Sequence, residues 1–250
     1  MPSGGGFDGL VRACKYSFST NRLDYCGEHG AFTEFQSFLD GPDEGKAVKI
    51  RALFHSFTGL YAYLELIASC NARDPLDADV VEAYWLGNNL LDNVPAENVR
   101  EMLLQRLSGP GLLPRRIAEE KASVLSGKVF PHHSFHVLHV NFVTEKVAPL
   151  LGNLDNCIIH WGRVKEAEEN CLLVEGVELF EGERVLALRP AEKRIDRGLA
   201  KDALPGDAVS IHWNSAVERI SPKQEGMLRR YTEENLALAN SVRSGFPPRP

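Results

Sequence analysis

The sequence predicts an α+β protein, in which an N-terminal all-helical bundle precedes a small β-barrel and a C-terminal helix. Before position 145 the apolar residues recur at steps of three and four, the spacing of helices with one buried face. Beyond Gly152 the apolar period shortens toward two, which is typical of strands. This change predicts a helical domain over 1–150, a barrel with its helix over 151–243 and a flexible tail over 244–250.

The helices of the first domain are predicted from apolar spacing and from residues that begin or end helices. Residues 46–69 have the clearest helical pattern. Asp77 can cap the amides of the next helix, Pro95 suits a first turn, and Gly127 suits a C-terminal cap. The predicted helices cover 7–18, 31–39, 46–69, 80–90, 95–107 and 115–126.

Short strands separated by turn-forming residues are predicted in the second domain. Gly162, Gly176, Gly182 and the segment 205–207 supply the turns. A last helix begins at Pro222. The predicted strands cover 157–161, 171–174, 184–188 and 209–213, enough for a small barrel.

Composition and charge narrow the classes of function. The 250 residues carry 28 Lys and Arg against 34 Asp and Glu, a net charge of −6, so there is no basic field to hold nucleic acid. No segment approaches the ~18–20 consecutive apolar residues that cross a bilayer, and the N-terminus lacks the pattern of a secretion signal. The five cysteines form no CxxC pair, which favours reduced thiols. We therefore expect a cytoplasmic protein without a nucleic-acid or membrane partner.

Four of the eight histidines lie between Pro131 and His139. If Pro131 begins a helix, His132, His136 and His139 stand at i, i+4 and i+7 on one stripe and can offer imidazole nitrogens to one metal ion. If the segment is a strand, His133 and His139 share a face and the three-histidine site is lost. Ring nitrogens that only bond to backbone carbonyls or carboxylates would make the cluster structural. As a metal site, the stripe leaves iron, nickel, zinc and copper open.

Two further residues are candidate metal ligands. Cys26 lies in a polar, glycine-flanked loop, where Arg22 can lower the pKa of the thiol and favour the thiolate that binds metals. Glu82, on a predicted helix, can add a carboxylate to a site inside the bundle. The alternatives are an ordinary loop cysteine and a solvated surface charge.

Two blocks in the last third resemble the HypC/HupF family of nickel–iron hydrogenase maturation chaperones. Residues 157–164, CIIHWGRV, are similar to the family's opening pattern of a cysteine, four residues and then Gly-Arg/Gln-Val. Residues 206–220, GDAVSIHWNSAVERI, look like its Gly-Asp-x-Val-x-Val-His-x-Gly block. Trp161 stands where the family has proline, and Asn214 where it has glycine.

The resemblance implies a five-stranded, OB-like barrel followed by a helix. It also implies that the thiolate of Cys157 binds an iron unit bearing cyanide and carbon monoxide, with His212 beside it in the site. The implied partner is the hydrogenase large subunit or another maturation protein. The whole chain is also similar to an uncharacterised family associated with hydrogenase gene clusters.

The leading hypothesis is an accessory or maturation protein for a nickel–iron hydrogenase, which binds or delivers iron and docks a partner. The second is a metal-dependent enzyme of the non-haem iron type, with a histidine-lined site in the helical domain. The third is a metal-free interaction scaffold. For the first hypothesis, metal affinity should fall as the pH drops through the range in which histidine titrates.

Overall fold

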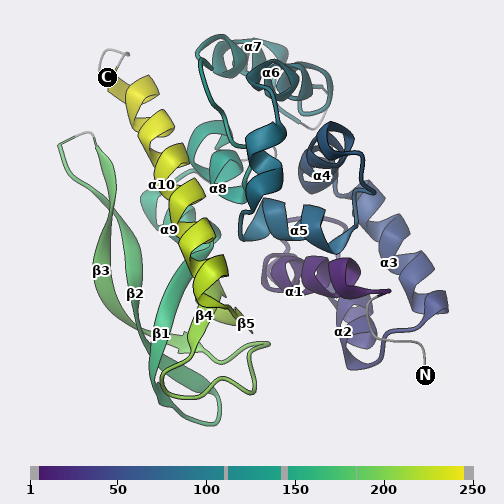
Figure 1. The fold of residues 1–250 in the computed structure, drawn as a ribbon, viewed down its shortest axis with the longest axis vertical. Helices are drawn as coiled ribbons and strands as arrows, with labels where there is room; N and C mark the ends of the chain where they lie inside the picture. Colours follow the sequence, from purple (N-terminus) through teal and green to yellow (C-terminus); the bar gives the residue numbers. More distant parts are fainter. Residues whose placement is uncertain (1–5, 110–111, 142–145, 184, 245–250) are drawn as a thin grey trace.

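The computed structural model describes residues 6–109, 112–141, 146–183 and 185–244, so the predicted tail over 244–250 lies outside the described residues from position 245 onward. The fold combines a helical N-terminal part with a sheet and a C-terminal helix, as predicted, and the sheet has five strands. In Figure 1 most helices lie on one side of the molecule and the strands on the other, with the yellow helix α10 (Pro222–Ser244) between them. None of the described helices is long and apolar enough to span a lipid bilayer.

Helices make up most of the chain as far as Cys157. The helix predicted to reach Leu90 ends at Trp85, and the one predicted to reach Ser126 ends at Ser123. The helical elements are α1 (Asp8–Arg22), α2 (Phe32–Asp40), α3 (Glu44–Ser56), α4 (Thr58–Asn71), α5 (Ala78–Trp85), the 3-10 helix η1 (Asn89–Asn93), α6 (Ala96–Gln105), α7 (Arg115–Ser123), α8 (His133–Phe135), the π-helix η2 (His136–Val140) and α9 (Leu151–Cys157).

The single helix predicted over 46–69 is wrong. The chain leaves helical geometry at Phe57, where φ is −78° and ψ is 71°, and α3 and α4 meet there. The Phe57 ring is 2% exposed and packs against Phe35 and Phe54, with ring centroids 5.9 and 5.4 Å away. Burying this ring changes the chain direction, and the helical apolar pattern on both sides of Phe57 conceals the break.

Five strands pair in the order β1-β2-β3-β5-β4, and β4 also pairs with β1, so the pairings close into a ring. The ring has its shortest pairing between β3 and β5, which are joined by one parallel residue pair, Asp196 and Ser215. Alternation predicts four strands and misses β5. The strand predicted from Cys157 begins only at His160, because Cys157 ends helix α9. The strands are β1 (His160–Ala167), β2 (Cys171–Glu181), β3 (Leu186–Asp196), β4 (Ala208–His212) and β5 (Ser215–Arg219).

One hydrophobic core joins the helices to the sheet. Trp161 of β1 belongs to the same buried cluster as the side chains of α1, α4 and α5. Two polar contacts cross nearby: Tyr16 Oη donates to Ser210 Oγ at 2.8 Å, and Arg12 Nε donates to Glu218 Oε1 at 2.9 Å. Helix α1 is therefore bonded to β4 and β5 across the predicted domain boundary.

The half-buried carboxylate of Asp155 fixes helix α9 to the sheet. Asp155 accepts hydrogen bonds from the Leu179 amide at 2.6 Å and from Lys193 Nζ at 3.1 Å. A third contact, at 2.8 Å, comes from His160 Nε2. Burial alone would raise the pKa of Asp155, but the hydrogen bond from His160 and the nearby charges outweigh burial and lower the pKa to about 2. The ionised carboxylate holds the end of α9, and with it Cys157, against the strands.

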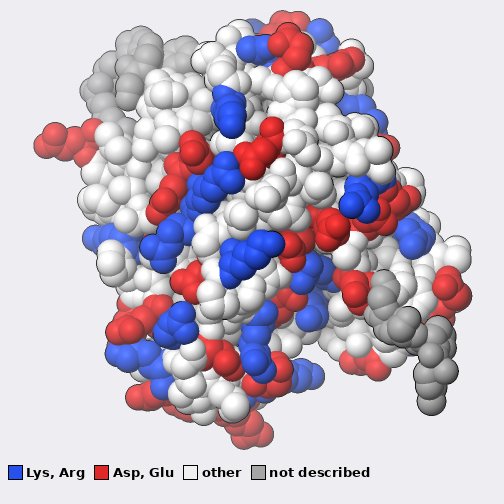
Figure 2. Space-filling view, in the orientation of Figure 1, with Lys and Arg blue, Asp and Glu red and all other residues white. Residues whose placement is uncertain are grey.

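Charged side chains of both signs are mixed over the face shown in Figure 2. No broad patch of one sign appears on that face. Charged side chains of opposite sign form many local pairs in the described part of the chain, as Arg230 does with Asp92 at 2.8 Å. Exposed pairs of this kind contribute little to stability, so the fold depends mainly on the shared core.

Replacing Gly9 with Ala is expected to destabilise the protein, because this glycine lets α1 approach the start of α5. A Cβ at Gly9 would lie 2.0 Å from Leu76 O and 2.9 Å from Ala78 N, and both are backbone atoms. The overpacking should lower the free energy of unfolding by about 1–3 kcal/mol. Chemical denaturation measures the change.

The matched control is Gly226, which is exposed in α10 and has no atom within 4 Å of an added Cβ. Gly226→Ala should raise the free energy of unfolding by about 0.5–1 kcal/mol, since alanine is the better helix former. If Gly9→Ala were as stable as the wild-type protein, the close approach of α1 and α5 would be contradicted.

Candidate metal centre

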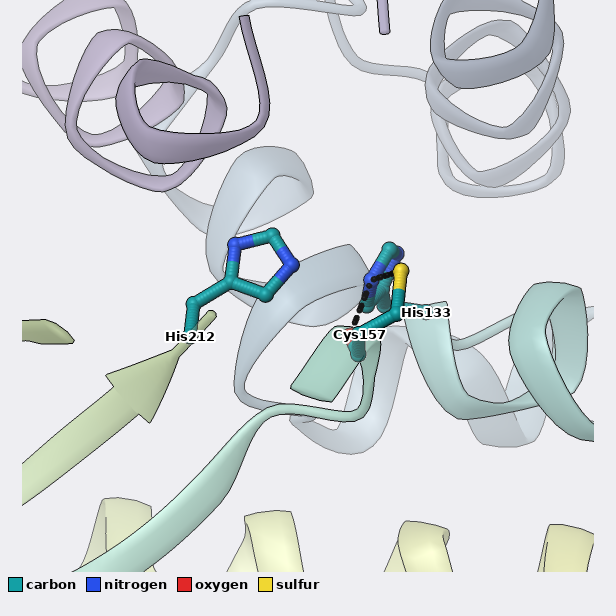
Figure 3. Close-up of side chains that lie close together, drawn as sticks. All are labelled: His133, Cys157 and His212. Carbon is teal, nitrogen blue, oxygen red and sulfur yellow. Dashed lines mark hydrogen bonds between the residues drawn. The ribbon is translucent and has the colours of Figure 1, made fainter. Parts of the chain in front are cut away.

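Three segments that are distant in sequence bring one group of side chains together. His133 begins α8, Cys157 ends α9, and His212 ends β4. One ligand atom from each lies within 4.8 Å of the others. Figure 3 shows the His133 ring beside the Cys157 sulfur, with His212 extending toward them from the end of its strand. Within the described ranges, no other three His, Cys, Asp or Glu side chains form such a group.

Hydrogen bonding determines which nitrogen of His212 is available. Its Nδ1 donates to the Tyr16 carbonyl at 2.9 Å, because a carbonyl oxygen can only accept. Its Nε2 therefore carries a lone pair, and this buried atom has no hydrogen-bond partner in the described part of the chain. An imidazole held through one nitrogen, with the other nitrogen bare, is the usual state of a metal-binding histidine.

His133 lies between a tyrosine hydroxyl and Cys157. Its Nδ1 is 3.0 Å from Tyr84 Oη, and its Nε2 is 2.9 Å from the Cys157 carbonyl oxygen and 3.8 Å from Cys157 Sγ. Nε2–H donates to that carbonyl, and Tyr84 then donates to Nδ1. If the proton moves to Nδ1, where Tyr84 Oη can accept it, Nε2 is free to bind a metal beside the sulfur.

Burial keeps all three side chains uncharged at neutral pH. Removal from water lowers the pKa of His212 to about 4 and the pKa of His133 well below 6.5, where neighbouring histidines add to the effect. Burial also raises the pKa of the Cys157 thiol. The imidazoles are therefore ready to bind a metal, whereas the thiol must first release its proton.

The three side chains line a cavity of about 250 Å³. Its walls come from α1, the loop after α1, the junction of α3 and α4, α5 and the end of β4. Polar groups from Ser17, Thr20 and Trp213 are among its lining. The described residues around it include no Asp or Glu. The cavity therefore offers nitrogen, sulfur and hydroxyl groups to a ligand, but no carboxylate.

A family profile matches residues 6–245, nearly the whole chain, and describes a family of unknown function. The chain belongs to the DUF6390 family. No curated protein and no solved structure matches it. His133, Cys157 and His212 of this DUF6390 member all lie within the matched range.

Cys26 reaches the same cavity from the loop after α1. Asn21 Nδ2 holds this loop by donating to the carbonyls of Cys26 and Glu28, at 2.9 and 2.7 Å. Gly27, at φ 80°, lies against the Phe57 ring, which a Cβ at this position would overlap. The loop and the break between α3 and α4 thus close one side of the cavity together.

The predicted lowering of the Cys26 pKa is wrong. The residue is exposed as a whole, but its sulfur lies among cavity side chains, and burial raises the pKa to about 11, which Lys146 opposes only in part. Arg22, expected to stabilise the thiolate, lies over the Phe18 ring at 5.9 Å. A Cys26 thiolate would therefore need a metal rather than a neighbouring arginine.

The three histidines of the predicted stripe, His132, His136 and His139, do not converge on a common metal site. His132 is the N-cap of α8, and its Nδ1 accepts from the Ser134 amide at 3.2 Å. His139 is buried elsewhere and donates from Nε2 to the Lys121 carbonyl at 3.0 Å. These two rings serve the polypeptide itself, which is the structural alternative for a histidine cluster.

The third member of the stripe, His136, does line the cavity. Its Nδ1 is 3.3 Å from Tyr63 Oη, and its ring centroid is 6.2 Å from that of His133. Sequence reasoning gave no ligand role to His133 when the segment is helical. The cap formed by His132 sets the helical phase and turns His133 inward. The local signal of this cap is His132 itself, because it lies two residues before Ser134 and its side chain can accept a hydrogen bond from the Ser134 amide.

Glu82 does not join the histidines. Its Oε2 accepts from Arg12 Nη1 at 3.1 Å and from Gln224 Nε2 at 2.8 Å. These bonds link α5 to α1 and α10, and Glu82 is not among the described cavity residues. Its carboxylate therefore connects helices.

Proposed function

We propose that this chain binds an iron unit through His133, Cys157 and His212 and serves as an accessory protein in the maturation of a nickel–iron hydrogenase. The observation that carries the proposal is the convergence of two neutral imidazoles and one thiol on a single cavity. Such a set suits a transition metal, because imidazole and thiolate are strong ligands for iron, zinc and copper.

The choice of iron rests on the resemblance to the maturation chaperones. Cys157 and His212 are the positions that the resemblance assigns to the site, and their ligand atoms lie within 4.8 Å of each other and of His133. His133 comes from the helical part, outside the resembling region. The proposed site therefore combines a chaperone-like sheet with a ligand from the helices.

The ring of strand pairings supports an OB-like barrel as the carrier of the site. The departure at Asn214 fits this fold, since its φ of 56° is a left-handed conformation that asparagine tolerates where the family has glycine. We propose that the barrel docks the hydrogenase large subunit or another maturation protein, which receives the metal.

We favour coordination and transfer of a metal over catalysis at a non-haem iron site. That type needs a carboxylate beside two histidines. The candidate, Glu82, bonds to Arg12 and Gln224 instead. Three protein ligands in a cavity with spare volume leave positions that a receiving protein can use during transfer.

Metal analysis of protein purified without an affinity tag tests the proposal. We expect stoichiometric iron in the wild-type protein and loss of most of it in Cys157→Ala, because the thiolate is the only charged ligand. Cys14→Ala is the matched control: Cys14 is also buried, but it lies in α1 and is not among the described cavity residues. It should keep its iron.

Infrared bands of iron-bound cyanide or carbon monoxide would support a maturation cargo, and iron without them would favour an enzyme. Wild-type protein that takes up no iron, zinc or cobalt on reconstitution would contradict the metal site and leave a scaffold. Equal metal in the wild-type protein and in folded Cys157→Ala would exclude this thiol.

A further inference from the structure

We infer that the metal is held in this cavity together with a small anion, which binds the metal and accepts hydrogen bonds from Trp213, Trp85 and Ser17. The inference rests on the proposed metal site and names what the metal carries. It follows from donor groups of cavity-lining residues that have no acceptor among the described residues.

Unpaired polar atoms are concentrated at this cavity. Seven buried side-chain nitrogen or oxygen atoms in the described residues have neither a hydrogen-bond partner nor an ion-pair partner, and four of them belong to residues that line it. One is His212 Nε2, the proposed ligand atom. The others are Ser17 Oγ, Trp85 Nε1 and Trp213 Nε1. Unpaired buried polar groups are rare in folded proteins, so a cluster of them indicates a bound partner.

The chemistry of these groups specifies the partner. An indole N–H can only donate, and a serine hydroxyl can donate as well as accept. A bare metal ion repels the two indole N–H groups, because each presents a positively polarised hydrogen, whereas the Ser17 hydroxyl can rotate to suit either a metal or an anion. A metal-bound anion removes this conflict, since its atoms accept the hydrogen bonds while its charge binds the metal.

Trp213 is held at the cavity at a conformational cost. Its φ of 50° is the left-handed region, which is unfavourable for a bulky side chain. The backbone compensates, because Trp213 N donates to Asn156 O at 2.8 Å, and the ring packs on Tyr25 with centroids 4.6 Å apart. These contacts place the indole beside His212 and Cys157. Its N–H faces the Cys157 sulfur closely enough to oppose the rise in the pKa of that thiol, but it makes no hydrogen bond of good geometry with any described residue.

The size of the cavity agrees with an ion that brings its own ligand. Its volume of about 250 Å³ is many times the ~10–15 Å³ that one water requires on the same measure. A metal bound to three side chains fills little of this space. A compact anion on the open side of the metal would reach the donors on α1, α5 and the end of β4.

The test uses the full chain loaded with Co²⁺, whose visible spectrum reports its ligands, and titrates it with azide as the anion. Trp213→Phe keeps an aromatic ring but removes the N–H, and Ser17→Ala removes the hydroxyl. We expect each to raise the azide Kd about tenfold, with Co²⁺ affinity unchanged. The matched controls are Trp161→Phe and Ser19→Ala, both buried and outside the described cavity lining. They should bind azide as the wild-type protein does.

The outcomes separate this inference from the proposed function. Co²⁺ that fails to bind the wild-type protein contradicts the metal site and this inference together. Bound Co²⁺ with the same azide Kd in all variants contradicts the anion alone and leaves the metal site standing. If Trp213→Phe weakens Co²⁺ itself and not azide, its N–H serves the Cys157 sulfur, and the inference is wrong.

Discussion

Acidification should unfold the metal-free protein cooperatively between about pH 6.5 and pH 4. Burial lowers the pKa of His136, His139 and His212 to about 4 and that of His132 to about 3 in the folded state. In the unfolded chain each ring titrates near 6.5. Protons therefore bind the unfolded state first as the pH falls, and stability is lost from pH 6.5 down to the folded pKa.

The expected loss is large because several rings contribute. A ring whose pKa falls from 6.5 to about 4 or about 3 costs about 3 kcal/mol at pH 4. Four rings together cost about 12 kcal/mol, which is comparable to the whole stability of a typical domain. Circular dichroism or tryptophan fluorescence against pH measures the transition. A protein that stays folded at pH 4 would show that the buried rings accept protons without penalty.

Single substitutions connect the transition to particular rings. His139→Gln can keep the hydrogen bond to the Lys121 carbonyl but no longer titrates, so the midpoint should move to lower pH. His29→Gln is the matched control, because the His29 side chain is 88% exposed and lies in an exposed pair with Asp24. Its midpoint should be that of the wild-type protein. Denaturation at pH 7.5 verifies that both variants fold.

Metal affinity should rise about tenfold per pH unit between pH 5 and 8, a change of about a thousandfold. The imidazoles are already neutral over this range, since the pKa of His212 is about 4 and that of His133 is lower than 6.5. The Cys157 thiol is protonated over the same range, because burial raises its pKa. One proton therefore leaves with each metal ion bound, and it comes from sulfur.

Competition with a chelator of known proton affinity measures this slope, and calorimetry in two buffers counts the released proton. The sequence also predicts that metal affinity falls with pH, but it attributes the fall to protonation of histidine. Burial lowers the pKa values of His133 and His212, so protonation of the thiol is the expected cause between pH 5 and 8. Cys26→Ala is the comparison, since a second thiolate ligand would give a slope of two that this variant reduces to one. A flat curve from pH 5 to 8 would mean that no thiolate binds the metal.

Much of the architecture was predictable from local pattern. The change of apolar period near Gly152 lies close to the observed change from helices to strands, which follows the end of α9 at Cys157, and Pro222 begins the last helix. The break at Phe57 was not predictable from period, because α3 and α4 each continue a helical pattern up to it. Strand β5 follows β4 after a turn in which Trp213 and Asn214 both have positive φ. Neither is a glycine, so the usual turn signal is missing.

By itself, the sequence determined which ligand types this protein contains and pointed to Cys157 and His212 as candidates. The tertiary structure alone decided that His133 completes the group, while His132 caps a helix and His139 bonds to Lys121. The physical reason is that ligation depends on where side chains from α8, α9 and β4 meet. A helical stripe describes neighbours within one element, whereas the packing of three elements sets the distances among His133, Cys157 and His212.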